Sequence, residues 1–239
     1  MEALTDVLID RSVPGAATQF LTALLDLDRA SARELARDVA QREGSLAVVD
    51  MVIAPAMRRI GDLWARGDVD VAQEHAATVV ARDALATIDV GLQSRNWVSD
   101  APRVVCFAPE GERHELPVLM VAAVLEGAGW QVLCLGCDLP AKDLAASVRL
   151  FRAEVTCMSL TTDAALDGAR EALDALADAP GGGPRAWIGG GAVDRPSGAL
   201  ELATCGGELV GRSMSELSHR ATRFLSDRRV AALHLGDAA

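Results

Sequence analysis

Two residues near the middle of the chain, Glu112 and His114, have the types and the spacing of a metal site. They lie in a polar loop that follows an apolar run, Val104 to Pro109, typical of a buried strand. Open parallel sheets bind ligands outside the carboxyl ends of their strands. Glu112 is close enough to accept a hydrogen bond from one ring nitrogen of His114, which leaves the other nitrogen to bind a metal. We therefore predict that His114 is an axial ligand to a metal-centred cofactor.

Two later loops carry residues suited to holding a polar ligand. The segment Ser159-Leu160-Thr161, with hydroxyls at both ends, closes one apolar run, and the glycine triplet Gly189-Gly190-Gly191 closes the next. Hydroxyls can hydrogen-bond a buried ligand, and glycines let the backbone approach a ligand closely because they have no side chain. Together with His114, these loops predict a slot along one edge of a sheet. The alternative is a set of tight turns with capping hydroxyls.

A third set of chemically capable residues lies in the first half of the chain. Trp64 falls near the end of one predicted helix, and Glu74 and His75 fall in the first turn of the next. A tight turn at Gly67 and Asp68 should bring all three to one end of a helical bundle. The alternative is that Trp64 is a core residue and that Glu74 and His75 are an exposed polar pair.

The elements of the second half follow the alternation of a parallel α/β sheet. Apolar, strand-like runs lie at residues 103–108, 131–137, 154–160, 185–191 and 207–211. Helical patterns follow them at residues 115–128, 141–152, 164–178, 197–204 and 214–226. Strands that alternate with helices through short loops imply a parallel sheet covered on both faces. We predict a flavodoxin-like, Rossmann-like five-stranded sheet with strand order 2-1-3-4-5.

The first half has helical periodicity throughout and predicts an all-α cap, a four-helix bundle. Its predicted helices cover residues 14–28, 31–44, 46–67 and 71–93, with a kink at Pro55. Ser31 and Ser45 have the position of helix caps, and Asp70 with Gln73 has capping-box spacing. A linker at residues 89–103 separates a cap domain, residues 1–97, from the sheet domain, residues 98–239.

Composition narrows the function classes. The formal net charge of −11 argues against direct nucleic-acid binding, which needs a basic face. No apolar run reaches the length of a membrane span, and the first residues lack the pattern of a signal peptide. The five cysteines lie mostly in apolar, strand-like runs, which suits free thiols in a reducing compartment. We expect a soluble protein of the cytoplasm.

The loop residues of the second half resemble the cobalamin-binding domain of the methionine synthase type. That family carries Asp-x-His-x-x-Gly, Ser-x-Leu or Ser-x-Thr, and Gly-Gly on successive loops. This chain has Glu112-Arg113-His114-Glu115-Leu116-Pro117, Ser159-Leu160-Thr161 and Gly189-Gly190. The resemblance implies that His114 replaces the dimethylbenzimidazole base on cobalt and that the nucleotide tail lies between the other two loops. Pro117 replaces the family's glycine, a change compatible with the first turn of a helix.

The first half resembles the helical cap of adenosylcobalamin-dependent photoreceptor regulators (the CarH type). Their signature of Trp, nine residues and Glu-His is kept as Trp64, Glu74 and His75. In that branch the tryptophan packs on the adenosyl group, light breaks the cobalt–carbon bond, and the cap then shifts. The residue after the tryptophan is often a histidine that binds cobalt after photolysis. Here it is Ala65, so a second ligand after photolysis has to be another group, for which His75 is a candidate.

The resemblance implies a regulator with cobalamin, most simply adenosylcobalamin, as its cofactor, and not an enzyme. The photoreceptor regulators carry a DNA-binding domain before the cap, whereas about thirteen residues that are not basic precede the bundle here. We therefore expect the light signal to pass through a partner protein such as a transcription factor, or through a change in homo-oligomeric state. Two alternatives stay open: a corrinoid methyl carrier of a methyltransferase system, and a haem-binding sensor on the same fold.

Overall fold

The computed structural model describes residues 15–89, 100–178 and 183–236. The chain forms two compact units, Met1–Asn96 and Trp97–Ala239. Most of the predicted linker, residues 90–99, lies outside the described residues. None of the helices in the described ranges is both long enough and apolar enough to cross a bilayer.

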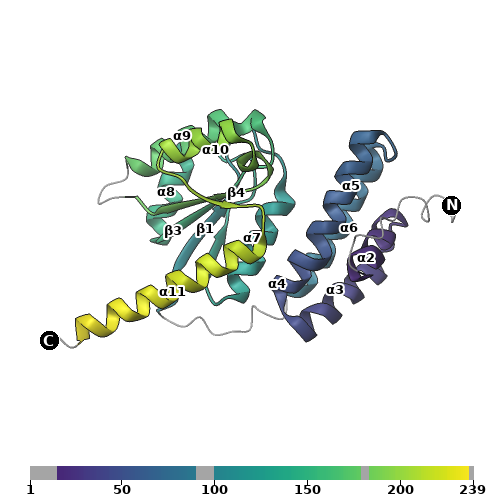
Figure 1. The fold of residues 1–239 in the computed structure, drawn as a ribbon, viewed down its shortest axis with the longest axis horizontal. Helices are drawn as coiled ribbons and strands as arrows, with labels where there is room; N and C mark the ends of the chain where they lie inside the picture. The colour runs from purple at the N-terminus through teal and green to yellow at the C-terminus, as the bar shows by residue number, and fades with distance from the viewer. Residues whose placement is uncertain (1–14, 90–99, 179–182, 237–239) are drawn as a thin grey trace. The chain divides into compact units, whose positions relative to one another are not determined.

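The first unit is a bundle of helices (Figure 1). Its elements are α2 (Gly15–Leu25), α3 (Arg29–Glu43), α4 (Ser45–Val48), η1 (Val49–Ile53), α5 (Ala54–Arg66) and α6 (Val71–Asp89). Because α4, η1 and α5 follow one another without a gap, they form one continuous rod, and the predicted four-helix cap is confirmed. Large side chains with no exposed surface fill its core, among them Phe20, Leu21, Leu24, Ile53, Ile60 and Leu63.

Two of the predicted helix caps differ from those in the structure. The cap predicted at Ser31 is wrong, because α3 begins at Arg29 and the carboxylate of Asp28 accepts the backbone N–H groups of Ala30 and Ser31, each at 3.1 Å. The cap predicted at Ser45 is also wrong. That residue is already helical, and Gly44, with φ 88°, occupies the position before it.

The start of α6 is a complete capping box, as predicted. The backbone N–H of Gln73 donates to Asp70 Oδ1 at 2.8 Å, and the backbone N–H of Asp70 donates to Gln73 Oε1 at 2.9 Å. The end of α5 is also as predicted, since Gly67 adopts the left-handed conformation with φ 80°. These two ends fix the short link between α5 and α6.

The kink at Pro55 stays a prediction; what the structure has near it is a π-helical turn, η1, that ends two residues before Pro55. The backbone N–H of Ala54 donates to the carbonyl oxygen of Val49, five residues earlier instead of four. Pro55 is the second residue of α5 and has no N–H to donate to the preceding turn of the rod. The rod nevertheless continues through Pro55, with the π-helical turn just before it.

The second unit contains the predicted five-stranded parallel sheet, and its order β2-β1-β3-β4-β5 is confirmed. The strands are β1 (Arg103–Phe107), β2 (Gln131–Cys134), β3 (Val155–Ser159), β4 (Arg185–Gly189) and β5 (Glu208–Gly211). The helices are α7 (Glu115–Gly127), α8 (Ala141–Phe151), α9 (Leu166–Ala177), α10 (Pro196–Thr204) and α11 (Met214–Gly236), with the 3-10 turns η2 (Asp163–Ala165) and η3 (Gly191–Asp194).

Helices cover both faces of the central strands β1 and β3, whose alternate residues point to opposite sides of the sheet. Along β1, Val104 and Cys106 pack with residues of α7 and α11, whereas Val105 and Phe107 pack with residues of α8 and α9. Figure 1 shows α7 and α11 side by side on the first of these faces. Both sides of the sheet are therefore closed, and its strand ends are the places left for a site.

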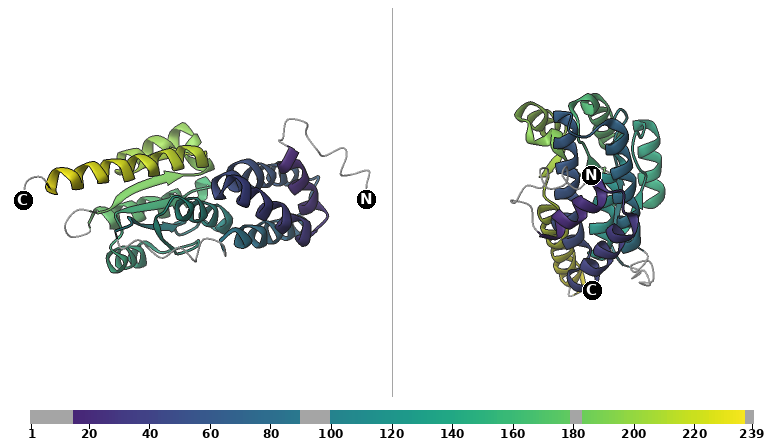
Figure 2. Two further views of the ribbon diagram at one scale, coloured as in Figure 1. Left: turned by 90° about the horizontal axis from the view of Figure 1, so that it is seen from below. Right: turned by 90° about the vertical axis from the view of Figure 1, so that its right-hand side faces the viewer.

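The last helix is longer than predicted. We expected it to end at residue 226, but α11 continues to Gly236. Figure 1 and Figure 2 both show its C-terminal end extending beyond the strands. Leu217 and Ala221 anchor its first part in the core beside Trp187.

Candidate functional site

His114 lies between the loop that leaves β1 and the first turn of α7. It occupies the position immediately before the helix, with extended backbone (φ −79°, ψ 96°), and its side chain is 54% exposed. The helix begins at Glu115, so Pro117 falls in its first turn, where a proline costs no backbone hydrogen bond. The imidazole is therefore presented at the carboxyl edge of the sheet by a short loop with a rigid element on each side.

Glu112 is the buried residue of this loop, with 1% of its surface exposed. Its Oε1 accepts hydrogen bonds from the backbone N–H of His114 at 3.1 Å and from Nδ1 of the same ring at 2.5 Å. Its Oε2 accepts the backbone N–H groups of Thr161 and Thr162, at 2.7 and 3.0 Å. The hydrogen bond between Glu112 and His114 was predicted, whereas the bonds to the loop after β3 were not. One carboxylate thus ties the loops of two neighbouring strands together.

These contacts decide the ionisation of Glu112. Burial by itself raises the pKa of a carboxyl group, but the hydrogen bonds from the His114 ring, from the backbone of His114 and from the N–H groups of Thr162 and Thr161 outweigh it and lower the pKa to about 2. Glu112 is therefore a carboxylate at neutral pH. An ionised acceptor at Nδ1 keeps the proton on that nitrogen and the lone pair of the neutral ring on Nε2. This is the arrangement of a histidine that binds a metal through Nε2.

Beside this loop, Ser159 ends β3 and Thr161 lies in the loop that follows, at the carboxyl edge of the sheet as predicted. Between them, the side chain of Leu160 is in the core, and its backbone bonds the neighbouring segment. Leu160 is fully buried, its N–H donates to the carbonyl oxygen of Gly189 at 2.8 Å, and its carbonyl oxygen accepts the N–H of Ala192 at 3.1 Å. Ser159 is 5% exposed, and Thr161 is half-buried. Of the three, the two hydroxyl side chains are the ones suited to binding a ligand.

The glycine triplet at the end of β4 is required by the protein's own backbone. A Cβ on Gly190, which has φ 116°, would lie 2.3 Å from the carbonyl oxygen of Leu160, and a Cβ on Gly189 would lie 2.8 Å from that of Gly211. A Cβ on Gly191 would lie 3.1 Å from the carbonyl oxygen of Thr161. The glycines therefore allow the ends of β4 and β5 and the loop after β3 to pack closely, a reason that the sequence did not show. Their role in cofactor binding stays a prediction.

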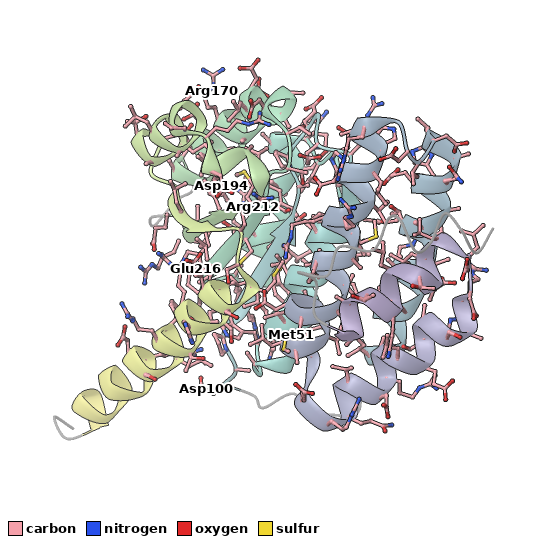
Figure 3. The ribbon with its side chains drawn as sticks, turned by 45° about the vertical axis from the view of Figure 1, so that its right-hand side comes forward. Met51, Asp100, Arg170, Asp194, Arg212 and Glu216 are labelled. Atoms are coloured by element: carbon pink, nitrogen blue, oxygen red, sulfur yellow. The ribbon has the colours of Figure 1, made fainter. Side chains whose placement is uncertain are left out.

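Ion pairs connect the same loops at their outer side. Arg195 pairs with Asp163 of the loop after β3, and Arg212, just beyond β5, pairs with Asp194 at 3.1 Å. Figure 3 shows Asp194 and Arg212 pointing toward each other. All four side chains are partly exposed, and such pairs contribute about 0–1 kcal/mol each to stability. These ion pairs connect the loops at this edge of the sheet but contribute little to its stability.

The remaining predicted residues of the loop after β1 differ in burial. Arg113 is exposed, Glu115 is half-buried, and Leu116 is 6% exposed and belongs to the core. The side chains of Arg113 and Glu115 can therefore reach a ligand at this edge, whereas that of Leu116 supports the start of α7. Their part in cofactor binding also stays a prediction.

In the other unit, the structure brings Trp64, Glu74 and His75 to one end of the bundle, around the link between α5 and α6. The side chain of Trp64 is 51% exposed, so the alternative that it is a core residue is wrong. Glu74 accepts a hydrogen bond from Thr78 Oγ1 at 3.0 Å, and its other carboxylate oxygen lies 3.6 Å from His75 Nε2. The cap therefore presents an indole, a carboxylate and an imidazole at the same end.

One residue of the sheet edge was missed in the sequence. Asp138, in the loop after β2, accepts the N–H of Gly111 through Oδ1 at 2.8 Å and donates its own N–H to the carbonyl oxygen of Glu112 at 2.9 Å. Its signal was a turn-forming sequence, Gly136-Cys137-Asp138-Leu139-Pro140, at the end of a strand. That pattern predicts a turn but gives no indication of which loop the turn contacts.

Comparison with known proteins shows what the two units are similar to. Two family models, both described as B12 binding domain, match residues 16–88 and 102–210. The HTH-type transcriptional repressor CarH of Myxococcus xanthus is 30% identical over 148 residues, which are 62% of this chain and 48% of that protein. Dimethylamine corrinoid protein 1 of Methanosarcina mazei is 21% identical over 129 residues, 54% of this chain and 60% of that protein. The match with CarH thus spans about half the length of that relative.

The fold also has a counterpart among solved structures. The monomethylamine corrinoid protein of Methanosarcina barkeri superposes with a TM-score of 0.69 over 86% of this chain and 96% of that one, at 17% identity. At this identity the likeness supports a common fold of helical cap and parallel sheet.

Proposed function

This chain belongs to the B12-binding domain family, and from that premise we propose that it is a cobalamin-binding light sensor, not an enzyme, that acts through a partner protein. Two features support the binding of cobalt by His114. The half-exposed ring has its lone pair on Nε2, and the ionised Glu112 fixes its orientation. Ser159 and Thr161, on the adjacent loop, are the side chains that we propose for the nucleotide tail. The site residues thus suit a corrinoid with a histidine as lower ligand.

The exposure of Trp64 is the observation that carries the sensor function. A free-standing bundle would gain by burying an indole, yet this one leaves half of it accessible beside Glu74 and His75. We propose that Trp64 packs on the adenosyl group of adenosylcobalamin, whose cobalt–carbon bond is sensitive to light. When the adenosyl group leaves, the dark arrangement of the cap loses the contact that stabilises it. The equilibrium between the dark and the illuminated arrangement of the cap then shifts.

The residue after Trp64 is Ala65, whose methyl group cannot bind a metal. In this proposal His75, with a side chain that is 73% exposed, is the second histidine ligand after illumination. Glu74, 3.6 Å from the ring of His75, is placed to orient it. The output then passes to a protein partner such as a transcription factor, or to a second copy of the chain. A net charge of −11 disfavours DNA as the direct target.

A second candidate function is that of a corrinoid methyl carrier. The similarity to the dimethylamine corrinoid protein favours it, and the fold is compatible with it. The two functions differ in what the cap must do, because a methyl carrier has to expose the upper face of cobalt to a partner enzyme. A tryptophan that selects an adenosyl group is useful to a sensor and an obstacle to a carrier.

The deciding experiment is a visible spectrum of the protein reconstituted in the dark with adenosylcobalamin, desalted, and measured again after green light. We expect a retained corrinoid with a histidine-ligated spectrum that changes on illumination. His114→Ala should lose the histidine-ligated spectrum. His219→Ala, which alters an exposed histidine on α11, is the matched control and should keep it.

Other outcomes separate the alternatives. Equal affinity for adenosylcobalamin and methylcobalamin, with no response to light, would contradict the sensor and favour the methyl carrier. An unchanged spectrum in His114→Ala would contradict the assignment of the lower ligand. Failure to retain any corrinoid, with a Soret band after reconstitution with haem, would replace cobalamin by haem as the cofactor.

A further inference from the structure

We propose that Asp138 is a second positioning residue for His114, acting on the backbone of the loop that carries it. The inference deepens the proposed function, because it concerns the same histidine as a cobalt ligand. Its basis is the pair of hydrogen bonds that run in opposite directions between the loops after β2 and β1. Asp138 Oδ1 accepts the N–H of Gly111 at 2.8 Å, and the N–H of Asp138 donates to the carbonyl oxygen of Glu112 at 2.9 Å.

The loop after β2 is itself held firmly against β1. Leu135 donates its N–H to the carbonyl oxygen of Cys106 at 2.8 Å, Gly136 accepts the N–H of Ala108 at 2.9 Å, and Leu139 donates its N–H to the carbonyl oxygen of Ala108 at 3.1 Å. These bonds extend the pairing of the two strands past their ends. Asp138 therefore acts from a fixed position when it binds the backbone of the next loop.

The backbone of Asp138 is unusual, since its φ of 57° is left-handed. Aspartate and asparagine adopt this conformation more readily than other residues with a side chain. The partner residue Gly111 is also left-handed, with φ 87°. The carboxylate of Asp138 thus holds the N–H of a glycine whose backbone is otherwise free to take many conformations.

Two sets of hydrogen bonds therefore hold the same short loop, one from each neighbouring strand's loop. Asp138 fixes the backbone at Gly111 and Glu112 from the β2 side, and the N–H groups of Thr161 and Thr162 fix the carboxylate of Glu112 from the β3 side. Glu112 in turn accepts the hydrogen bond from the ring of His114. The orientation of the imidazole therefore depends on the backbone position that Asp138 sets.

The test uses two variants at this position. Asp138→Gly keeps the left-handed backbone but removes the acceptor, whereas Asp138→Asn keeps both the conformation and an Oδ1 acceptor. Arg152→Gly is the matched control, because Arg152 is another exposed residue with a left-handed φ, of 55°, at the end of α8. A general effect of glycine at a left-handed position would appear in that control.

Two measurements follow each variant. In the unliganded protein, hydrogen exchange of the Gly111 amide should become about tenfold faster or more in Asp138→Gly, because a hydrogen bond to a charged acceptor is lost. The ¹⁵N chemical shifts of the His114 ring should move toward those of a mixture of tautomers. In the protein loaded with adenosylcobalamin, the histidine-ligated fraction should fall. Asp138→Asn should restore most of each readout, and Arg152→Gly should leave all of them unchanged.

The outcomes separate this inference from the proposed function. If Gly111 exchanges faster in Asp138→Gly while the His114 shifts and the histidine-ligated fraction match the wild type, Asp138 is a turn residue only and the inference is overturned. If the wild type binds no corrinoid, the proposed function fails, and the ring shifts of the unliganded protein still decide whether Asp138 positions His114.

Discussion

The carboxylate of Glu112 lies 2.7 Å from the backbone nitrogen of Thr161, 49 residues further along the chain. It binds the loop after β3 with one oxygen and His114 with the other. A buried carboxylate with several hydrogen-bond donors stabilises the fold only while it is ionised. This relationship makes Glu112 a carboxylate on which the acid stability of the second unit depends.

Because the pKa of Glu112 is lowered to about 2 in the folded protein from an ordinary value of 4.5, its contribution is fully present above pH 4.5 and is lost as the pH falls toward 2. Glu112→Gln should therefore lower the free energy of unfolding at pH 7 and flatten its fall between about pH 4.5 and 2. Urea unfolding at a series of pH values measures this. Glu110→Gln, an exposed carboxylate of the same loop, is the control, and an identical pH profile for Glu112→Gln and the wild type would contradict the assignment.

A side chain at Gly190 should disrupt the edge of the sheet. Its Cβ would lie 2.3 Å from the carbonyl oxygen of Leu160, and its φ of 116° is strained for any other residue. We expect Gly190→Ala to lower the free energy of unfolding by about 3 kcal/mol or more, from backbone strain and displacement together. Gly206→Ala, with φ 88° and open space around the new Cβ, should cost only about 1–2 kcal/mol. Equal losses in thermal unfolding would mean that the contact with Leu160 is unimportant.

The neighbours Trp64 and Leu63 allow stability and ligand selection to be separated. Leu63 is fully buried, so Leu63→Ala should cost about 2–5 kcal/mol in the unliganded protein. Trp64 is 51% exposed, so Trp64→Ala should cost less than about 1 kcal/mol. In the proposed function, only Trp64→Ala abolishes the preference for adenosylcobalamin over methylcobalamin. Titration of both cofactors into each variant in the dark checks this, and a preference that survives in Trp64→Ala would remove the indole from the upper face.

The capping box at the start of α6 should position Glu74 and His75 as well as stabilise the helix. Asp70→Ala should lower the free energy of unfolding by about 1 kcal/mol, because the N–H of Gln73 loses its acceptor. Asp68→Ala, an exposed aspartate of the same link that lies outside the box, is the control. Chemical denaturation measures the loss. If both variants lower the free energy of unfolding equally, the loss comes from removing a negative charge near the helix start and not from the capping hydrogen bond.

Much of the sheet domain could be predicted because its signals are local. Short apolar runs bounded by Gly and Pro locate the strands, and a carboxylate two residues before a histidine predicts the bond between Glu112 and His114. The bonds from Glu112 to Thr161 and from Asp138 to Gly111 depend on which strands are neighbours. The residues of these loops do not indicate which loop lies beside them. The order 2-1-3-4-5 was predicted, but the hydrogen bonds between neighbouring loops were not.

Errors at the helix starts have a different cause. Asp28 and Ser31 are both good caps three residues apart, so the local sequence offers two nearly equal solutions. Asp28 caps the helix with its two carboxylate oxygens, accepting the N–H groups of Ala30 and Ser31 and the hydroxyl of Ser31. The glycine pattern shows the same limit, since the need for Gly190 comes from Leu160, which lies on another strand's loop.

The π-helical turn Val49–Ile53 is a place where the cap's longest rod can change length without changing direction. A π-turn holds about one residue more than the α-helical turn it replaces. Deletion of Met51, which is 48% exposed within the turn and labelled in Figure 3, should therefore leave a regular α-helical turn and keep the buried Ile60 and Leu63 on the core side of α5. A deletion inside α5 would instead rotate the residues beyond it by about 100° and take Trp64 with them. In this rod the π-turn provides a spare residue, whose loss leaves the direction of Trp64 unchanged.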